Sequence, residues 1–310
     1  MALPNYYKKL LSTGPFWTLV FLSFIWGYNW VVMKVALNDS GPFDFAALRS
    51  VLGALSLILV LLVLRKRFWP KNIGAIFFLG LFQTAGFTGF AVWALKSGGA
   101  GKVAFLTFTM PFWAMLFAWF SLNERVKGLQ WLAILFALLG LLLILEPWSL
   151  DGSFKSETLA VLAGISWAIS VIIAKKIREE DPGIDLLTLT TWQMFFGSIP
   201  LVITALFVYE PPIKWTASYI GALAYNAVPA NALAWLLWLY ILKKLSAGVA
   251  SLSTLAIPVV GMLSSWVQLG EKPSQSEIFG IVSIALGLVV LSSSALFSKK
   301  HVRAGSDYSN

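Results

Sequence analysis

The sequence predicts an all-α membrane protein in which ten transmembrane helices form two inverted five-helix repeats around a central cavity. Three observations predict this fold class. The 310 residues are 58% hydrophobic and only 12% charged, whereas about a quarter of the residues of a soluble domain are charged. Apolar stretches of membrane-spanning length recur along the chain. The C-terminal half also repeats the residue pattern of the N-terminal half.

Each predicted span is long enough to cross a bilayer, because about 20 helical residues match the hydrocarbon core. Strands are not expected, since the apolar runs are long and lack a two-residue alternation. The first run exceeds the apolar core of a signal peptide and is followed by further spans, so we interpret it as a retained helix. The predicted spans are 16–37, 43–64, 72–94, 100–122, 128–147, 157–177, 186–209, 216–242, 247–269 and 275–297.

The ten spans divide into two groups of five. We expect a first repeat over residues 16–147 and a second over 157–297, joined by a connector at 148–156. Residues 1–15 and 298–310 are expected to be short cytoplasmic segments.

Lys and Arg residues are unevenly shared between the two membrane faces. With the N-terminus in the cytoplasm, sixteen of the 23 basic residues fall on the cytoplasmic side and five on the other. This bias is typical of a protein with both termini inside. The net charge of +9 is therefore assigned to contacts with anionic lipid, and no nucleic-acid partner is expected because no basic domain exists.

The residue inventory predicts no enzyme, metal site or cofactor. The chain has no cysteine and one histidine, His301, which falls in the polar tail. All fourteen carboxylates fall in connectors, in tails or at the start of a span. An intramembrane enzyme needs a nucleophile–base pair or a metal cluster, and a channel needs a charged ring or a carbonyl filter. Neither pattern is present, so no catalytic residue is assigned.

The internal repeat is clearest where 95–141 meets 242–288. A shift of 147 residues gives fifteen identities in these 47 positions. Upstream the shift becomes smaller: Gly53 matches Gly197 at a shift of 144 residues, and Trp26 matches Trp167 at a shift of 141 residues. The informative matches pair Gly101 with Gly248, Thr107 with Thr254, Pro111 with Pro258, Trp119 with Trp266, Glu124 with Glu271 and Gly140 with Gly287.

Because each repeat holds an odd number of spans, the second copy enters the membrane from the opposite side. Inverted repeats give two near-equivalent conformations, one open to each face, which is the geometry that alternating access requires. The alternative is a gene duplication without any transport role.

These matched residues, together with Trp26-Gly27-x-Asn29 in the first span, resemble the EamA repeat of the drug/metabolite transporter superfamily. The segment Trp167-Ala168 lacks the glycine of that opening motif. The resemblance covers essentially the whole chain, and the nearest members are the YddG-type aromatic amino-acid exporters of bacterial inner membranes. It implies ten helices around a cavity lined by spans 1, 3, 4, 6, 8 and 9, and a place in the bacterial inner membrane.

Polar and aromatic side chains within the spans are the candidate cavity residues, because an unpaired amide in hydrocarbon costs several kcal/mol. Several share a helical face within one span. The alternative for any one of them is hydrogen bonding between helices. Together they suit a small amphipathic solute with an aromatic or aliphatic part. The candidates are Trp26, Asn29, Trp30, Met33, Gln83, Phe87, Thr107, Trp167, Ser170, Asn226, Asn231, Trp235 and Thr254.

Two cations lie inside predicted spans. Lys34 and Arg49 occupy the outer thirds of spans 1 and 2. Either could contact a substrate carboxylate, and Arg49 lies deeper. The alternatives are snorkelling to the interface, or pairing with Asp39 or Asp44.

Four further residues occupy matched positions in the two repeats. Pro111 and Pro258 lie in the middle of spans 4 and 9, where a proline kinks a helix, and they are expected to serve gating or static shape. Glu124 and Glu271 follow the same spans and are expected to be structural corner residues, because each precedes the N-terminus of the next span.

The expected function is an alternating-access carrier that exports small organic metabolites, with aromatic or other neutral amino acids as substrates. Transport is expected to be facilitative, because no titratable carboxylate or histidine lies at membrane depth. The alternative of the same class is a drug or amine exporter, which would be expected to offer a cation an intramembrane carboxylate. The expected partners are a small-molecule substrate and membrane lipid. The oligomeric state is left open, and a monomer is compatible with the sequence.

Overall fold

In a computed structural model of the chain, residues 14–122, 128–145, 154–244, 256–287 and 289–290 are described. All regular structure within these ranges is helical, and they contain no β-strand. The predicted cytoplasmic segments and the connector fall wholly or largely outside the described residues, as do Glu124 and Thr254.

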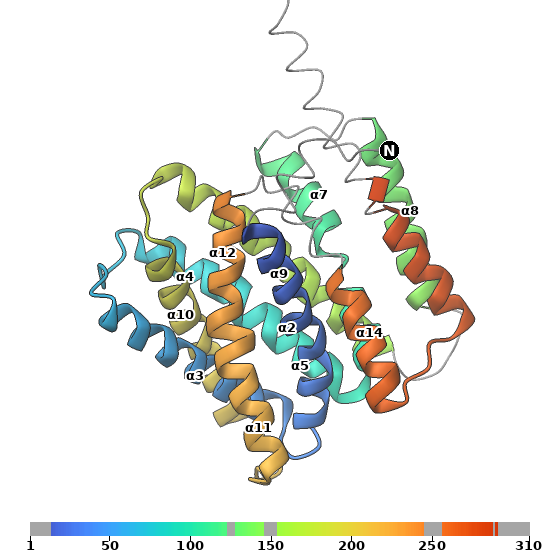
Figure 1. Cartoon of the computed structure of the whole chain (residues 1–310), viewed down its shortest axis with the longest axis horizontal. Helices are drawn as coiled ribbons and strands as arrows, with labels where there is room; N and C mark the ends of the chain where they lie inside the picture. Colours follow the sequence, from blue (N-terminus) through green and yellow to red (C-terminus); the bar gives the residue numbers. More distant parts are fainter. Residues whose placement is uncertain (1–13, 123–127, 146–153, 245–255, 288, 291–310) are drawn as a thin grey trace, which may run out of the picture.

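The helices follow one another with short connections, and α2 and α9 run through the middle of the bundle while α3, α4 and α10 lie to one side and α8 to the other (Figure 1). In chain order they are α2 (Gly14–Ala36), α3 (Pro42–Val63), α4 (Ile73–Gly80), η1 (Leu81–Gly86), α5 (Phe87–Ser97), α6 (Ala100–Thr107), α7 (Met110–Leu122), α8 (Leu129–Leu145), α9 (Phe154–Glu180), α10 (Leu186–Phe207), α11 (Ala217–Tyr225), η2 (Asn226–Leu233), α12 (Ala234–Lys244) and α14 (Ala256–Leu269). A further apolar helix covers Gln275–Gly287.

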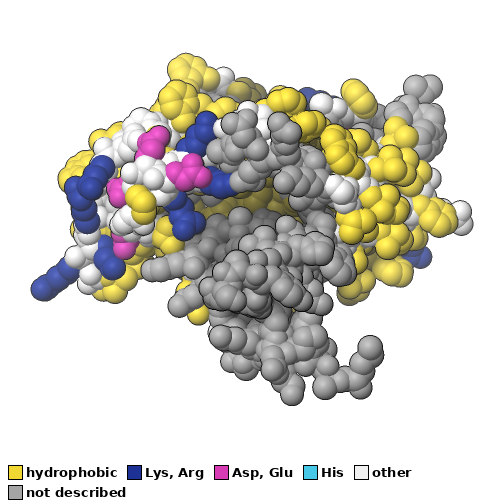
Figure 2. All heavy atoms as spheres, turned by 90° about the horizontal axis from the view of Figure 1, so that it is seen from above, with side chains coloured by type: hydrophobic (Ala, Val, Ile, Leu, Met, Phe, Trp, Pro, Cys, Tyr) yellow, Lys and Arg dark blue, Asp and Glu magenta, His cyan; other side chains and the backbone are white. Residues whose placement is uncertain are grey.

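Seven helical stretches of the described residues are long and apolar enough to span a membrane, so the chain is a multi-pass membrane protein. Much of their surface is apolar and faces outward, as lipid requires. Seen from one end, charged side chains gather over one part of the face and apolar side chains occupy much of the remaining rim (Figure 2). The seven stretches are Trp17–Ala36, Pro42–Val63, Ile73–Ser97, Ala100–Ser121, Phe154–Glu180, Leu186–Phe207 and Ala217–Trp238.

Two of these stretches change from α-helix to π-helix near their middle. In η1 the amide of Phe87 donates to the carbonyl of Phe82, five residues earlier. In η2 the amide of Ala234 donates to the carbonyl of Pro229. A π-helical segment widens the helix by one residue per turn, and such segments are frequent at functional sites. Pro229 favours the change because it has no amide hydrogen to donate.

Neighbouring helices also cross closely at or beside the π-helical segments. Gly53 lets α3 approach η2: a Cβ added at Gly53 would lie 3.1 Å from the Cβ of Asn231 and 3.2 Å from the carbonyl oxygen of Ala227. In the same way α10 crosses span 3 at Gly197, where an added Cβ would overlap the carbonyl oxygen of Gly80 and the Cβ of Thr84. These two contacts are called the α3–η2 crossing and the α10–η1 crossing below.

The remaining interhelical contacts surround these crossings. Helix α2 packs against α14, α11 and α12. Helix α9 packs against α5, α6 and α7. Most buried apolar side chains of the described residues form one continuous cluster that includes α2, α5, α6 and α9. Helices from early and late parts of the chain are therefore interleaved and do not form two separate bundles.

Gly197→Ala should lower the free energy of unfolding by about 1–3 kcal/mol, because the methyl group would be forced into Gly80 and Thr84. The matched control is Gly221→Ala on α11, where an added Cβ meets nothing within 4 Å. Thermal unfolding of both variants in the same detergent measures the difference. Equal melting temperatures for the two variants would contradict the close α10–η1 crossing.

Candidate functional site

A cavity lies between helices from both halves of the chain, at the level of η1 and η2. Its volume is about 60 Å³, several times the roughly 10–15 Å³ that one buried water needs on this scale. Its walls come from α2, α3, span 3, the α6–α7 junction, α9, α10 and span 8. The lining residues are Trp26, Asn29, Trp30, Met33, Arg49, Gln83, Thr84, Phe87, Thr88, Ala91, Phe108, Met110, Trp167, Met194, Ala230, Asn231, Trp235 and Trp238.

Tryptophan side chains from three helices form one wall of the cavity. The Trp26 ring meets the Trp235 ring edge to face, with centroids 5.2 Å apart, and the Trp238 ring lies 6.1 Å from Trp26 and 6.3 Å from Trp167. Such aromatic pairs are favourable beyond the area that they bury. The indole nitrogen of Trp26 also donates to the carbonyl of Ala230 in η2, at 3.0 Å. This wall therefore offers a fixed, largely apolar surface to a flat or aliphatic group.

Arg49 is the only ionisable side chain among the lining residues. It is 5% exposed, and its Nη2 donates to Oδ1 of Asn231 at 3.2 Å, while Nδ2 of Asn231 donates to the Arg49 carbonyl, also at 3.2 Å. Nη1 contacts the sulfur of Met33 at 2.9 Å, and Nε has no partner. None of the ion pairs between described residues involves Arg49. The ion pair of Arg49 with Asp39 or Asp44, which was an alternative from the sequence, is therefore not present in the structure.

Neutral polar groups complete the lining. The Thr84 hydroxyl donates to Oε1 of Gln193 at 2.9 Å, and Nε2 of Gln193 is buried without a partner. Asn29 is 5% exposed and its Oδ1 has no partner. Buried polar atoms normally have partners. Gln193 and Asn29 therefore hold spare hydrogen-bonding capacity in or beside the cavity wall.

The structure brings ten of the sequence-predicted candidates together around this cavity. They come from five different helical stretches, and several lie more than 100 residues apart in sequence. They are Trp26, Asn29, Trp30, Met33, Arg49, Gln83, Phe87, Trp167, Asn231 and Trp235.

Four other candidates are not among the lining residues. The hydroxyl of Thr107 donates to the Ala160 carbonyl at 3.3 Å, that of Ser170 to the Trp167 carbonyl at 2.6 Å, and Nδ2 of Asn226 to the Ala222 carbonyl at 3.0 Å. The Lys34 ammonium donates to two carbonyls at the C-terminal end of α5, those of Leu95 and Gly98, at 2.7 and 2.6 Å. A cation at a helix C-terminus is favourable, so Lys34 has a structural explanation.

The proline at mid-membrane depth in span 4 marks a break and not a bend. Helix α6 ends at Thr107, and α7 begins at Met110 with Pro111 as its second residue. Proline is well tolerated in the first turn of a helix, where its missing amide hydrogen breaks no bond. Pro258 is the third described residue of α14, and the residues before Ala256 lie outside the described ranges. Phe108 and Met110, which flank the break, both line the cavity.

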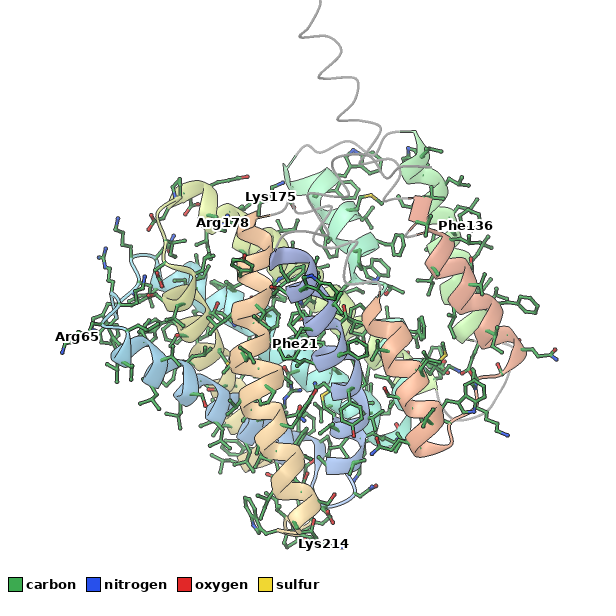
Figure 3. All side chains as sticks on the ribbon, viewed as in Figure 1. Phe21, Arg65, Phe136, Lys175, Arg178 and Lys214 are labelled. Atoms are coloured by element: carbon green, nitrogen blue, oxygen red, sulfur yellow. The ribbon has the colours of Figure 1, made fainter. Side chains whose placement is uncertain are left out.

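Side-chain bonds join helices at both ends of the molecule. At one end Lys66 pairs with Asp185, and Asn72 donates to Glu180. Others lie at the end that carries Lys214, away from Lys175 and Arg178 (Figure 3). There the Lys102 ammonium lies 2.7 Å from Glu157 and 3.4 Å from Glu277, which joins α6, α9 and the helix Gln275–Gly287.

Two further carboxylates cap helices at this end. Glu271 accepts the amide of Gly101 at 3.4 Å, in the first turn of α6, and also the hydroxyl of Ser265. Glu210 accepts the amides of Phe43 and Asp44 at the start of α3, at 3.1 and 3.0 Å. Burial raises the pKa of Glu210, although these amides act in the opposite direction. A carboxylate at a helix N-terminus is favourable, and Glu271 occupies a corner of this kind.

Several lining residues were missed by sequence reasoning. Trp238 follows the predicted Trp235 by one helical turn, so helical spacing could have found it. Met194 comes from α10 and carries no local signal. The complete set that was missed is Thr84, Thr88, Ala91, Phe108, Met110, Met194, Ala230 and Trp238.

Comparison with known proteins gives one family. The model of the EamA-like transporter family matches the chain twice, over residues 13–146 and 154–293. The uncharacterized transporter YoaV of Bacillus subtilis is 28% identical over 291 residues, which cover 92% of this chain and 98% of that protein. A protein of Salmonella typhimurium named as a probable amino-acid metabolite efflux pump is 30% identical over 278 residues, 86% of this chain and 90% of that one. A crystal structure of another protein aligns with a TM-score of 0.65 at 17% identity, over 91% of this chain and 96% of that chain, and it shows a shared fold.

Trp26→Phe should lower the free energy of unfolding by about 1–3 kcal/mol, because the Ala230 carbonyl would lose the indole donor while the aromatic contact largely remains. Trp167→Phe is the matched control, since the structure shows no bond from that indole nitrogen to another described residue. Thermal unfolding in detergent measures both. If Trp167→Phe proves as destabilising as Trp26→Phe, the hydrogen bond from Trp26 to η2 does not contribute to stability as predicted.

Proposed function

We propose that this chain, which belongs to the EamA-like transporter family, is an alternating-access carrier that exports aromatic and other neutral amino acids. Its family places it among the membrane transporters of the drug/metabolite transporter superfamily, and it is not an enzyme. The observation that carries the proposal is the buried cavity, whose walls combine tryptophan rings with one cation. Such a chamber suits a small solute that has both an apolar part and a carboxylate.

We propose that the fold is two inverted five-helix repeats, and the two helix crossings support this. Gly197 lies 144 residues after Gly53, whereas Gly80 and Thr84 lie 147 residues before Ala227 and Asn231. The two glycines thus make the same contact with corresponding residues of spans 8 and 3. An internal two-fold relation produces this kind of exchanged contact. The boundaries 16–147 and 157–297 remain those expected from the sequence.

Other matched features also support the repeat. The π-helical segments η1 and η2 occupy corresponding places in spans 3 and 8. Helix α2 (span 1) packs on α14 (span 9), and α9 (span 6) packs on α7 (span 4). The two pairs correspond, because spans 6 and 9 are the second copies of spans 1 and 4. The family model also matches once in each half.

The proposed orientation has both termini in the cytoplasm, in a bacterial inner membrane. It follows from the excess of Lys and Arg on one face and makes the Lys214 end the outer end. The contacts of Lys102, Glu271 and Glu210 then bind helices together on the outer face. We infer that the described conformation is closed toward the outside. In the opposite conformation these bonds would have to break.

The substrate proposal follows from what the lining offers and what it lacks. Arg49 can receive a carboxylate, and the Trp26, Trp235 and Trp238 rings can receive an aromatic or aliphatic side chain. The lining includes no Asp or Glu, which disfavours the alternative of a drug or amine exporter, since a cationic solute needs a negative partner at depth. The naming of a relative as a probable amino-acid metabolite efflux pump points in the same direction.

Single alanine substitutions of Trp26, Asn29 and Trp167 should each weaken exchange of the transported amino acid, by about tenfold for a buried aromatic anchor. Counterflow of labelled amino acids into proteoliposomes measures this, with the amount of inserted protein held equal. Phe120→Ala, at an outward-facing site of 73% exposure, is the control and should exchange normally. Parent-like exchange in all three cavity variants would refute the assignment of the cavity.

An imposed pH gradient should not drive net accumulation of the amino acid. The reason is that Arg49 is the only ionisable lining residue and a guanidinium does not release its proton in the physiological range. Accumulation is measured in proteoliposomes with the inside made acidic or alkaline, and a substrate gradient alone serves as the positive control. Uptake that follows the pH gradient would show proton coupling and contradict facilitative transport.

A further inference from the structure

The one cation of the cavity is held by a neutral amide, where a buried charge usually has a counter-ion. Arg49 and Asn231 exchange two hydrogen bonds across the α3–η2 crossing, and both side chains are more than nine-tenths buried. A buried charge without an opposite charge is costly. An anion that reaches Arg49 would therefore bind the guanidinium more strongly than the neutral amide of Asn231 does.

The free atoms of Arg49 show which edge an anion would use. Nε has no partner, and Nη2, on the same edge of the guanidinium, is held by Oδ1 of Asn231. A carboxylate binds a guanidinium best through two parallel hydrogen bonds along one edge. A carboxylate on the Nε–Nη2 edge competes with Oδ1 of Asn231 for Nη2.

The corresponding crossing in the other half also has a side-chain hydrogen bond, but it is uncharged and runs in the opposite direction, from Thr84 of η1 to Gln193 of α10. Gln193 lies 144 residues after Arg49, and Thr84 lies 147 residues before Asn231, and these two side chains are bonded across the α10–η1 crossing. The side-chain bond is thus common to both crossings. The cation is present at only one of them, so only that crossing can respond to an anion.

We propose that the Arg49–Asn231 bond is a latch that the substrate carboxylate opens. The carboxylate takes the Nε–Nη2 edge of Arg49, and Oδ1 of Asn231 loses its bond to Nη2. The α3–η2 crossing keeps only the bond from Nδ2 of Asn231 to the Arg49 carbonyl and loosens, while the α10–η1 crossing stays bonded. The proposal rests on the transport function proposed above and adds a ligand requirement: a carboxylate group opens the crossing, and an ammonium group does not.

The position of the latch fits this role. Gly53 brings α3 against Ala227 and Asn231, so the bond lies at the contact where α3 and span 8 would slide past each other. The segment η2 is also π-helical, and such segments are frequent at functional sites. A change in the bonds of the Arg49 side chain can therefore alter the packing of α3 against span 8.

The ligand requirement is tested with three related compounds on the full-length protein in nanodiscs: phenylalanine, 3-phenylpropionate and phenethylamine. Binding is measured from the ligand-induced shift of the melting temperature. In Asn231→Asp, a fixed carboxylate occupies Arg49, so the apparent affinity for phenylalanine and 3-phenylpropionate should fall at least about tenfold. The ligand-free variant should be as stable as the parent, because the buried charge is neutralised.

Two neutral variants separate the latch from a general loss of packing. Asn231→Ala should bind 3-phenylpropionate at least as tightly as the parent, because a competing acceptor has been removed. Ser166→Ala removes a side-chain bond between α9 and η1 at a residue outside the cavity lining, and should leave the affinity within about twofold, a change below 0.5 kcal/mol. Parent-like affinity in Asn231→Asp, or an equal loss in Ser166→Ala and Asn231→Ala, would overturn the latch.

Opening of the crossing itself is measured by distance. The chain has no cysteine, so spin labels at Leu55→Cys on α3 and Val228→Cys on η2, both outward-facing, report this crossing alone. 3-Phenylpropionate should broaden or lengthen the distance distribution, and phenethylamine should leave it unchanged. The same response to both compounds, or no response to a carboxylate that binds, would refute the latch. If the parent neither binds nor exchanges any of the carboxylates, the proposed substrate class itself fails.

Discussion

Every backbone polar group inside the hydrocarbon must find a partner within the protein, and the centre of this molecule follows from that constraint. The two π-helical segments present carbonyls that accept bonds from helices of the other half. The Trp26 indole donates to Ala230 in η2, and the Ser166 hydroxyl donates to Phe82 in η1. Irregular backbone is tolerated at this depth because α2 and α9 supply the missing donors. Trp26 and Ala230 both line the cavity, so one of these two bonds also forms part of its wall.

The same constraint explains why so much of the site was predictable from sequence. Trp26, Asn29, Trp30 and Met33 share one face of α2 by helical spacing alone, and a polar atom in lipid has few other places to go. All four line the cavity. The all-helical class and the seven apolar stretches follow from composition and run length, which are properties of single helices. The packing of one helix against another was beyond this reasoning.

What sequence reasoning missed depends on contacts between helices or on backbone geometry. Lys34 resembles a substrate contact until its two carbonyl partners on α5 are known. Met194 enters the lining only because Gly53 brings α3 close to α10. Pro111 predicts a kink, but the structure has a break between Thr107 and Met110, directly before the proline. The π-helical segments give no periodicity signal, because they are only six and eight residues long and a helical period needs a longer window to be recognised.

The two halves differ most where they carry charge. Arg49 and Gln193 occupy corresponding places, and both face a hydrogen-bonding residue on a π-helical segment. A carrier with a two-fold internal relation could have used a cation in both places, but two guanidiniums in one small apolar cavity would repel each other and would need two anions. One cation suits a solute with one carboxylate. Such an asymmetry can decide which solute opens the α3–η2 crossing. It cannot set the direction of net movement in a facilitative carrier. The solute gradient alone sets that direction, because the binding energy at a single site is the same from either side.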